Sequence, residues 1–179
     1  WILLLVVSPL LTSIIVRNVA WVLILGRSGM INDLLISWGL ISKPLPLMYN
    51  TFGVVLAVVH VYLSFMVLPL FAALSSINNS LEEAAASLGA KPLSIFLNVT
   101  LPLSLPGIMA GCTLVFILSM GVYLTPVIMG GNFGVTLPML IEDAVRNRYN
   151  WPDASAMALL LLIAIGIMIV ISSSIQKWV

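Results

Sequence analysis

Four long stretches of this sequence contain no charged side chain. Residues 1–16, 44–81, 92–141 and 154–176 lack Asp, Glu, Lys and Arg altogether. Across the 179 residues, 61% are hydrophobic and only 7% are charged, whereas charged residues make up about a quarter of an ordinary soluble domain. A chain with so few charges has little surface to offer to water. We therefore expect an integral membrane protein whose surroundings are the lipid bilayer.

The neutral stretches predict where the chain crosses the bilayer. A transmembrane helix needs about 20 largely apolar residues, because its backbone groups must be satisfied within the segment. The sequence predicts four such helices, at roughly 1–25, 50–74, 103–126 and 153–176. The glycine-rich segment 130–134 interrupts the third stretch, and too few apolar residues remain before Glu142 for another crossing. The predicted fold class is therefore all-α, a polytopic membrane protein.

The chain opens at Trp1 directly in an apolar run. No basic segment or cleavage site of a signal peptide precedes this run. We expect that further transmembrane helices precede Trp1 in the full protein.

Two amphipathic segments connect the first span to the second and the third to the fourth. Between 137 and 147, apolar residues recur at helical spacing and charged residues occupy the opposite face. Residues 31–38 repeat this pattern less regularly, and Gly39 is a plausible stop. We expect two short helices that lie at the membrane interface.

The segment between the second and third spans carries the signals of a helical hairpin. Ser80 and Glu83 can form a capping box, in which each side chain accepts a hydrogen bond from the backbone N–H of the other. The alanine-rich sequence that follows continues a helix, and Gly89 suits a left-handed C-terminal cap. Pro92 fits the first turn of a second helix that runs toward Pro102. We predict a rigid hairpin outside the bilayer, over about residues 76–102.

This hairpin resembles the EAA loop of permeases from binding-protein-dependent ATP-binding-cassette (ABC) importers. The motif consists of Glu83-Ala84-Ala85, three residues, Gly89, nine residues, Val99, one residue and Leu101-Pro102. Val99 stands where isoleucine is usual. The chain also looks like the spermidine/putrescine permease branch of this family, on the evidence of Arg17-Asn18-Val19-Ala20-Trp21, Leu25-Gly26-Arg27-Ser28-Gly29-Met30-Ile31-Asn32, Phe65-Met66-Val67-Leu68-Pro69-Leu70 and Asn150-Trp151-Pro152. It departs from that branch in Asn18-Val19, where Thr-Tyr is usual, and in Leu97-Asn98, where a basic pair is often found.

The resemblance implies a fold, a location and partners. It implies the type I importer permease (MetI-like) fold over residues 1–179, in the bacterial inner membrane, with the hairpin in the cytoplasm. The implied partners are two ABC ATPase subunits, a second permease chain (identical or different) and a periplasmic solute-binding protein. ATP and Mg²⁺ would bind to the ATPase, so the resemblance implies no cofactor, metal or catalytic residue on this chain. It assigns contact with the ATPase to Glu83, Ala84, Ala85, Gly89, Leu101 and Pro102.

The resemblance also implies a mechanism and a cargo. In this family, ATP binding closes the ATPase dimer and draws two EAA loops together, so that the spans switch from inward- to outward-facing. A helix pair stiffened by caps can transmit such a rigid-body push. Polyamine is the leading cargo, and ferric ion, thiamine, phosphonate or another small solute is the alternative.

Three residues are candidates for the solute pathway, namely Arg17, Trp21 and Asp153. An ionisable residue at the depth of Arg17 is a functional candidate, although its side chain could instead reach the headgroups or bind backbone carbonyls. Asp153 could begin the last span as a first-turn acid, and carboxylates on its side of the membrane could help to receive a cation. His60 has no carboxylate partner within its span, so we expect packing or a helix–helix hydrogen bond rather than a proton relay.

The distribution of basic residues conflicts with the orientation that the resemblance implies. Arg27, Lys43, Arg146 and Arg148 lie on one side of the predicted spans, against Lys91 and Lys177 on the side of the hairpin. The positive-inside rule would place the first group in the cytoplasm. We nevertheless follow the resemblance and expect a cytoplasmic hairpin.

Other classes of protein fit the sequence less well. A gradient-driven secondary transporter, the main alternative, would need paired charged groups within its spans, and the predicted span interiors are almost uncharged. The net charge of +1 without a basic run argues against nucleic-acid binding. The chain has no Gly-x-x-x-x-Gly-Lys-[Ser/Thr] phosphate-binding loop, so we assign ATP hydrolysis to a partner chain and predict a subunit that is not an enzyme.

Overall fold

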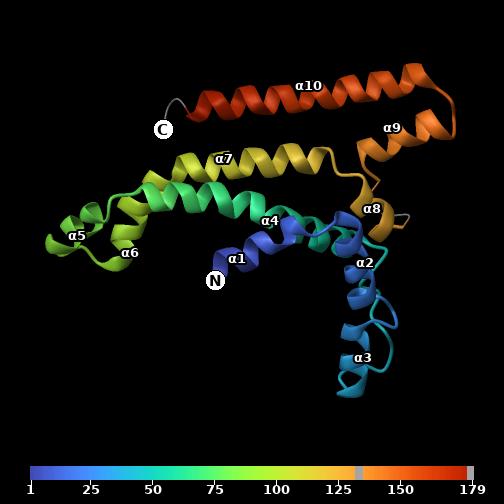
Figure 1. Cartoon of the computed structure of the whole chain (residues 1–179), viewed down its shortest axis with the longest axis horizontal. Helices are drawn as coiled ribbons and strands as arrows, with labels where there is room; N and C mark the ends of the chain where they lie inside the picture. The colour runs from blue at the N-terminus through green and yellow to red at the C-terminus, as the bar shows by residue number, and fades with distance from the viewer. Residues whose placement is uncertain (132–134, 177–179) are drawn as a thin grey trace. The chain divides into compact units, whose positions relative to one another are not determined.

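The computed structural model describes residues 1–131 and 135–176, which are predominantly helical and contain no β-strand (Figure 1). Four helical stretches in this described part are long and apolar enough to cross a membrane, and they comprise Ile14–Ser37, Thr51–Ser76, Pro92–Met120 and Trp151–Ser174. The all-α fold with four transmembrane helices is therefore confirmed.

The chain divides into two compact units. The first comprises Trp1–Ser64 and Leu118–Ala164, and the second comprises Phe65–Ile117 and the C-terminal segment from Ile165. The first unit holds α1 (Ile2–Val7), the 3₁₀ helix η1 (Ser8–Leu11), α2 (Ile14–Leu25), α3 (Met30–Ser37), the start of α4 (Thr51–Ser76), α8 (Leu124–Met129), α9 (Leu137–Arg146) and the start of α10 (Trp151–Gln176). The second holds the end of α4, α5 (Asn79–Ser87), α6 (Pro92–Ile95), the π-helical segment η2 (Phe96–Thr100), most of α7 (Leu101–Met120) and the end of α10.

The two longest helices, α4 and α10, begin in the same way. Each follows a tyrosine with a positive φ, 58° at Tyr49 and 52° at Tyr149. The next residue is an asparagine, Asn50 or Asn150, whose side-chain oxygen accepts from the backbone N–H three residues later, at 2.8 Å and 3.3 Å. Side-chain capping of this kind satisfies a helix N-terminus. The predicted spans 50–74 and 153–176 are thus confirmed to within two residues at their starts.

The prediction of one continuous helix over 1–25 is wrong. The chain is extended at Thr12, where the 3₁₀ helix ends, and α2 begins only at Ile14. Arg17 lies one turn into α2, and its guanidinium donates to the carbonyl oxygens of Pro9 and Thr12, the latter at 2.7 Å. Carbonyl groups that lose their helical donors are costly within a membrane. The Arg17 side chain therefore satisfies the backbone at the break, which is one of the roles left open by its sequence position.

The third predicted span, 103–126, is also wrong in its extent. The helix begins near Pro92, passes through η2 into α7 and ends at Met120, whereas α8 is a separate short helix. The turn in η2 is wider than that of an α-helix, because the Leu101 N–H donates to the Phe96 carbonyl five residues back instead of four. A proline ring inside an α-helix clashes with the carbonyl four residues before it. The π-turn lies directly before Pro102, and the helix continues through this proline into α7.

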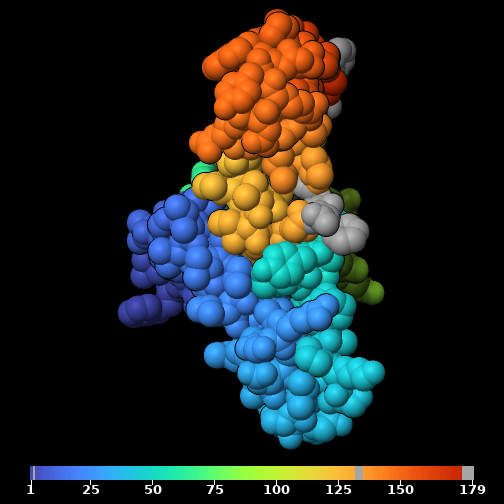
Figure 2. Space-filling model, turned by 90° about the vertical axis from the view of Figure 1, so that its right-hand side faces the viewer, coloured from blue at the N-terminus to red at the C-terminus, as the bar shows by residue number. Residues whose placement is uncertain are grey.

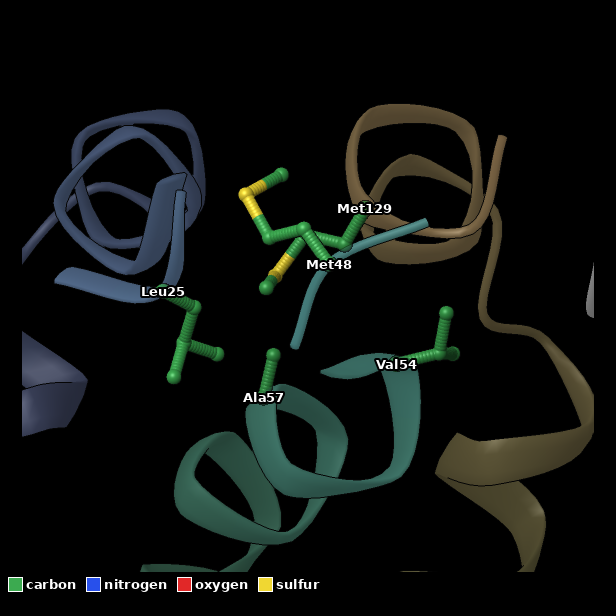
Figure 3. Packing of buried hydrophobic residues seen from close by; sticks show 5 residues of the cluster. All are labelled: Leu25, Met48, Val54, Ala57 and Met129. Carbon is green, nitrogen blue, oxygen red and sulfur yellow. The ribbon is translucent and has the colours of Figure 1, made fainter. Parts of the chain in front are cut away.

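The core of the first unit lies where three helices meet. Its most buried apolar side chains come from α2, α8, the start of α4 and the segment before α4, and they converge on one another (Figure 3). They are Leu25, Met48, Val54, Ala57 and Met129. This cluster holds α2 against α4 and α8, so the residues on the inner face of α2 have fixed positions.

Asn32 of α3 is fully buried and holds α3 to the segment that follows it. The two segments lie against each other in Figure 2. The Asn32 side-chain nitrogen donates to the carbonyls of Gly26 at 2.9 Å and Leu45 at 3.1 Å. Its oxygen accepts from the Leu45 N–H at 2.8 Å. The predicted helix over 31–38 and its stop at Gly39, which has φ +69°, are confirmed.

In the second unit, α7 lies directly beside α4 (Figure 1). The contact depends on two glycines of α7. A Cβ atom at Gly107 would lie 2.8 Å from the Pro69 carbonyl oxygen, and one at Gly111 would lie 2.7 Å from the Met66 sulfur. Small residues that allow backbones to approach are typical of helix contacts in membranes. Farther along α7, the Thr113 and Ser172 hydroxyls form a hydrogen bond that connects α7 to α10.

Candidate functional site

The predicted hairpin is present, and it consists of α5, a tight turn and α6 (Figure 1). The capping box predicted at Ser80 and Glu83 is wrong. The N-cap is Asn78, whose side-chain oxygen accepts from the Ser80 N–H at 3.0 Å. Asparagine is among the strongest N-cap residues, and Asn78 comes first along the chain. The helix therefore starts before Ser80 can act as a cap, which leaves Glu83 inside α5.

The turn between the two helices has the geometry that the sequence predicts. Gly89 has φ +81°, and its N–H donates to the Ala86 carbonyl at 2.9 Å. The next N–H, from Ala90, reaches back to the Ala85 carbonyl at 3.1 Å. These bonds close the C-terminus of α5 with a left-handed residue. Pro92 then occupies the first turn of α6, as predicted.

An open groove of about 490 Å³ runs between α5 and the segment formed by α6 and η2. Two carboxylates and several apolar side chains surround it, and the lining consists of Glu82, Glu83, Ala86, Pro92, Ile95, Phe96 and Thr100. Glu82 is half-buried, whereas Glu83 is exposed. Adjacent acids of the same helix thus have different surroundings.

The six predicted coupling residues are distributed over the length of the hairpin. Glu83, Ala84 and Ala85 lie on α5, with Glu83 and Ala84 exposed. Gly89 makes the turn, and Leu101 and Pro102 begin α7 directly after the π-turn. Leu101 supplies the N–H of the π-type hydrogen bond. The motif therefore marks the middle of α5, the turn after it and the start of α7.

Sequence reasoning missed one contact at this site. The Thr100 hydroxyl donates to the Glu82 carboxylate at 2.7 Å and so joins η2 to α5. Glu82 precedes the Glu-Ala-Ala triplet, and Thr100 fills the unspecified position between Val99 and Leu101. Eighteen residues separate the two. A local pattern cannot show a pairing at that separation.

A second group of polar side chains, buried or half-buried, connects helices of the first unit. The Trp21 indole N–H donates to His60 Nδ1 at 3.2 Å, and their rings meet edge to face with centroids 5.4 Å apart. The expectation that His60 makes a helix–helix hydrogen bond is thereby confirmed. Asn18 is completely buried and donates to the Thr125 hydroxyl at 3.3 Å. Its side-chain oxygen has no partner within the described part of the chain.

The candidate pathway residues belong to different elements. Arg17 and Trp21 lie one turn apart on α2, whereas Asp153 lies in the first turn of α10, as expected of a first-turn acid. The Asp153 carboxylate is exposed and accepts from the Asn150 side chain at 2.6 Å. Among residues 1–131 and 135–176, no cluster of three or more His, Cys, Asp or Glu side chains could hold a metal ion.

The acids of α9 are paired with neighbouring side chains. Glu142 lies 3.2 Å from Arg146, and Asp143 lies 2.6 Å from Arg148. Hydrogen bonds from Asn147 and then from Arg148 hold the pKa of the Asp143 carboxyl below its usual value. Lys177, one of the two basic residues that the sequence places on the side of the hairpin, lies outside the described residues.

Comparison with known proteins agrees with this architecture. The spermidine/putrescine transport system permease protein PotB of Escherichia coli is 32% identical over 93% of this chain and 61% of its own length. The PotB protein of Haemophilus influenzae is 34% identical over 92% of this chain and 58% of its own. The chain thus spans about three-fifths of the length of these relatives.

A solved structure and a family match complete the comparison. The crystal structure of a bacterial ABC transporter involved in the import of the acidic polysaccharide alginate matches 99% of this chain and 65% of its own, with a TM-score of 0.75 at 18% identity. That likeness shows the fold, which is the permease fold predicted from the sequence. The family of binding-protein-dependent transport system inner membrane components matches residues 1–179. The chain, with its four membrane-crossing helices, therefore belongs to the family of binding-protein-dependent transport system inner membrane components.

Proposed function

We propose that this chain is the solute-translocating permease subunit of an ABC importer, and that its α5–α6 hairpin docks a separate ATPase in the cytoplasm. One observation carries the proposal. The complete EAA spacing falls on a capped, exposed hairpin that connects two membrane-crossing helices. The whole assembly would contain two ATPase subunits, a second permease chain and a periplasmic binding protein. ATP and Mg²⁺ would bind to the ATPase.

The surface of the hairpin supports a docking role. Leu88 is 90% exposed, Leu93 is 70% exposed and Phe96 is 50% exposed. Exposed apolar side chains on a hairpin that we place in the cytoplasm point to an interface with another protein. Glu83 offers an exposed carboxylate beside them, and the small side chains of Ala84 and Ala85 allow close approach. The cap at Asn78 and the left-handed turn at Gly89 define the shape of the hairpin.

Co-purification with the ATPase tests the docking proposal. Glu83→Arg in the full-length permease should lose the ATPase, whereas Asp33→Arg, the same charge reversal at an exposed acid of α3, should retain it. Gly89→Ala provides a second comparison, with Gly39→Ala as its control. Both glycines have positive φ and open space around the missing Cβ, so each alanine costs about 1–2 kcal/mol of backbone strain. Only the change at Gly89 should weaken ATPase retention.

Two outcomes would contradict docking by the hairpin. Retention of the ATPase by Glu83→Arg would show that the exposed face of α5 is not the contact. Equal retention by the two glycine variants would show that the shape of the α5–α6 turn does not matter. If the wild-type permease retains no ATPase, the importer proposal fails as a whole, and gradient-driven transport takes its place.

For the cargo we propose a polyamine. The proposal is supported by the relatives of the spermidine/putrescine system, and ferric ion, thiamine and phosphonate remain the alternatives. Of the three pathway candidates we choose Trp21 for this cargo: the Arg17 guanidinium binds backbone carbonyls, the Asp153 carboxylate binds Asn150, and the bond from Trp21 to His60 involves only the indole N–H. An indole can bind a cationic amine by cation–π attraction.

Uptake of labelled spermidine by cells without polyamine importers tests this cargo. Cells that express the full importer should accumulate spermidine, and excess thiamine or phosphonate should not compete. Trp21→Leu should reduce uptake more than Trp38→Leu, which removes an exposed indole at the end of α3. Failure to accumulate spermidine, with normal ATPase retention, would reject the cargo and leave the docking proposal standing.

A further inference from the structure

The hairpin root contains a joint in the helix that connects it to the membrane. Between Phe96 and Thr100 the chain forms a π-helix, which lies between α6 and α7 within the helical stretch Pro92–Met120. Single π-turns are rare and occur frequently at functional sites. A π-turn interrupts the regular ladder of backbone hydrogen bonds, so a force on the hairpin would bend the chain there unless a second contact holds it.

The hydrogen bond between Thr100 and Glu82 is such a contact. The hydroxyl of Thr100, the last residue of the π-turn, donates to the carboxylate of Glu82 on α5 at 2.7 Å. Both residues are half-buried, and α5 contacts η2 as well as α6. A hydroxyl bound to a carboxylate is a charge-assisted hydrogen bond, which is stronger than a neutral one. The bond spans the joint and ties the far helix of the hairpin to the root of α7.

We propose that Glu82 is a positioning residue, whose carboxylate fastens α5 to the π-turn so that the hairpin and α7 move as one body. This inference rests on the proposed docking function, and it assigns different roles to two adjacent acids. Glu83 is exposed and available to the ATPase, whereas Glu82 turns inward and holds the hairpin at a fixed angle. Displacement of α5 by the ATPase then passes into the membrane instead of bending the chain at residues 96–100.

A distance measurement between two spin labels tests this role. One label is attached at Ser87→Cys on α5, and the other at Cys112 on α7, which is exposed and is the only cysteine of the chain. The full-length permease is studied in nanodiscs, alone and with its ATPase, in assemblies that carry one labelled chain. Thr100→Val removes the hydroxyl at constant size, and Thr100→Ser retains it.

The expected result differs between the two variants. The wild type and Thr100→Ser should give one narrow distance distribution, which stays the same when the ATPase is trapped with vanadate. In Thr100→Val, the ratio of hairpins that keep the wild-type distance to hairpins that have bent at residues 96–100 should fall by about tenfold. The bent hairpins should give a second, broader distance population, which should grow when the ATPase is trapped. Glu82→Ala should behave like Thr100→Val, and Glu82→Gln, which keeps an acceptor, should restore most of the narrow distribution.

Three results would overturn the role of Glu82. One is a narrow, unchanged distribution in Thr100→Val. Another is the same broadening in Thr100→Ser as in Thr100→Val, which would make the hydroxyl irrelevant. The third is a wild-type distance that shifts on vanadate trapping as far as the variants do. Absence of ATPase binding by the wild type would instead concern the docking proposal, because the distances of the permease alone still show whether Glu82 holds the hairpin.

Discussion

Replacement of Gly107 by alanine should destabilise the contact between α4 and α7. The added methyl group would lie 2.8 Å from the Pro69 carbonyl oxygen and closer still to the Ala73 Cβ. Neither of these atoms belongs to a side chain that can rotate away, so the two helices must separate. Overpacking of this kind costs typically about 1–3 kcal/mol, and alanine regains up to about 1 kcal/mol of helix propensity. We expect Gly107→Ala to lower the free energy of unfolding by about 1–2 kcal/mol.

Two other glycines provide matched comparisons. Gly166 lies in α10, where an added Cβ would meet nothing within 4 Å, so Gly166→Ala should leave stability unchanged or raise it. At Gly111 the nearest atom is the Met66 sulfur, at 2.7 Å, which belongs to a flexible side chain and can move. Gly111→Ala should therefore cost less than Gly107→Ala. Gly166→Ala should therefore be the most stable of the three variants, Gly111→Ala should be intermediate and Gly107→Ala should be the least stable.

The differences in the free energy of unfolding can be measured by reversible unfolding of the full-length protein in mixed detergent micelles. Helical circular dichroism is followed as the fraction of dodecyl sulfate rises. Each variant is first checked for normal membrane insertion. Equal midpoints for Gly107→Ala and Gly166→Ala would refute the reasoning, because they would show that the backbones of α4 and α7 can separate without loss of stability.

Three further predictions concern single hydrogen-bonded groups. Asn78→Ala should cost about 1 kcal/mol of α5 stability and speed hydrogen exchange of the α5 amides, whereas Ser80→Ala should leave exchange unchanged, because Asn78 is the cap. Asn32→Leu should cost about 2–4 kcal/mol in the same unfolding assay, since it strands buried backbone groups that three hydrogen bonds now satisfy. Asn147→Ala should raise the pKa of Asp143 in a carboxyl NMR titration. Because folding lowers that pKa, the stabilisation is present above the ordinary pKa of aspartate and is lost as the pH falls through the folded value; an unchanged titration would exclude the Asn147 bond as the cause.

The positions of α4 and α10 could be predicted because charge and turn residues bracket them on both sides. Gly39 and Gly89 were also predictable, since a glycine after an apolar repeat has few other roles. For these helices and turns a few neighbouring residues determine the structure, so a sequence pattern is sufficient. The motif at Glu83 could be found for another reason, because its spacing up to Pro102 resembles that of a known family.

The remaining features depend on contacts between distant residues or on competition between near-equal signals. The break at Thr12 is stabilised by Arg17, and hydropathy alone does not detect it. Asn78 and Ser80 are both good caps, and only the structure shows that the first one prevails. The bond between Glu82 and Thr100 joins residues that no local pattern relates.

The tyrosine–asparagine pairs before α4 and α10 set the rotational phase of each helix. Every residue of an α-helix advances its faces by about 100°, so the residue at which a helix starts decides which side chains point inward. The left-handed tyrosine ends the preceding segment and the asparagine cap starts the helix at a defined residue. The connections before Tyr49 and Tyr149 can therefore lengthen or shorten without turning either helix, whereas a single residue inserted after Asn50 or Asn150 would turn all that follows.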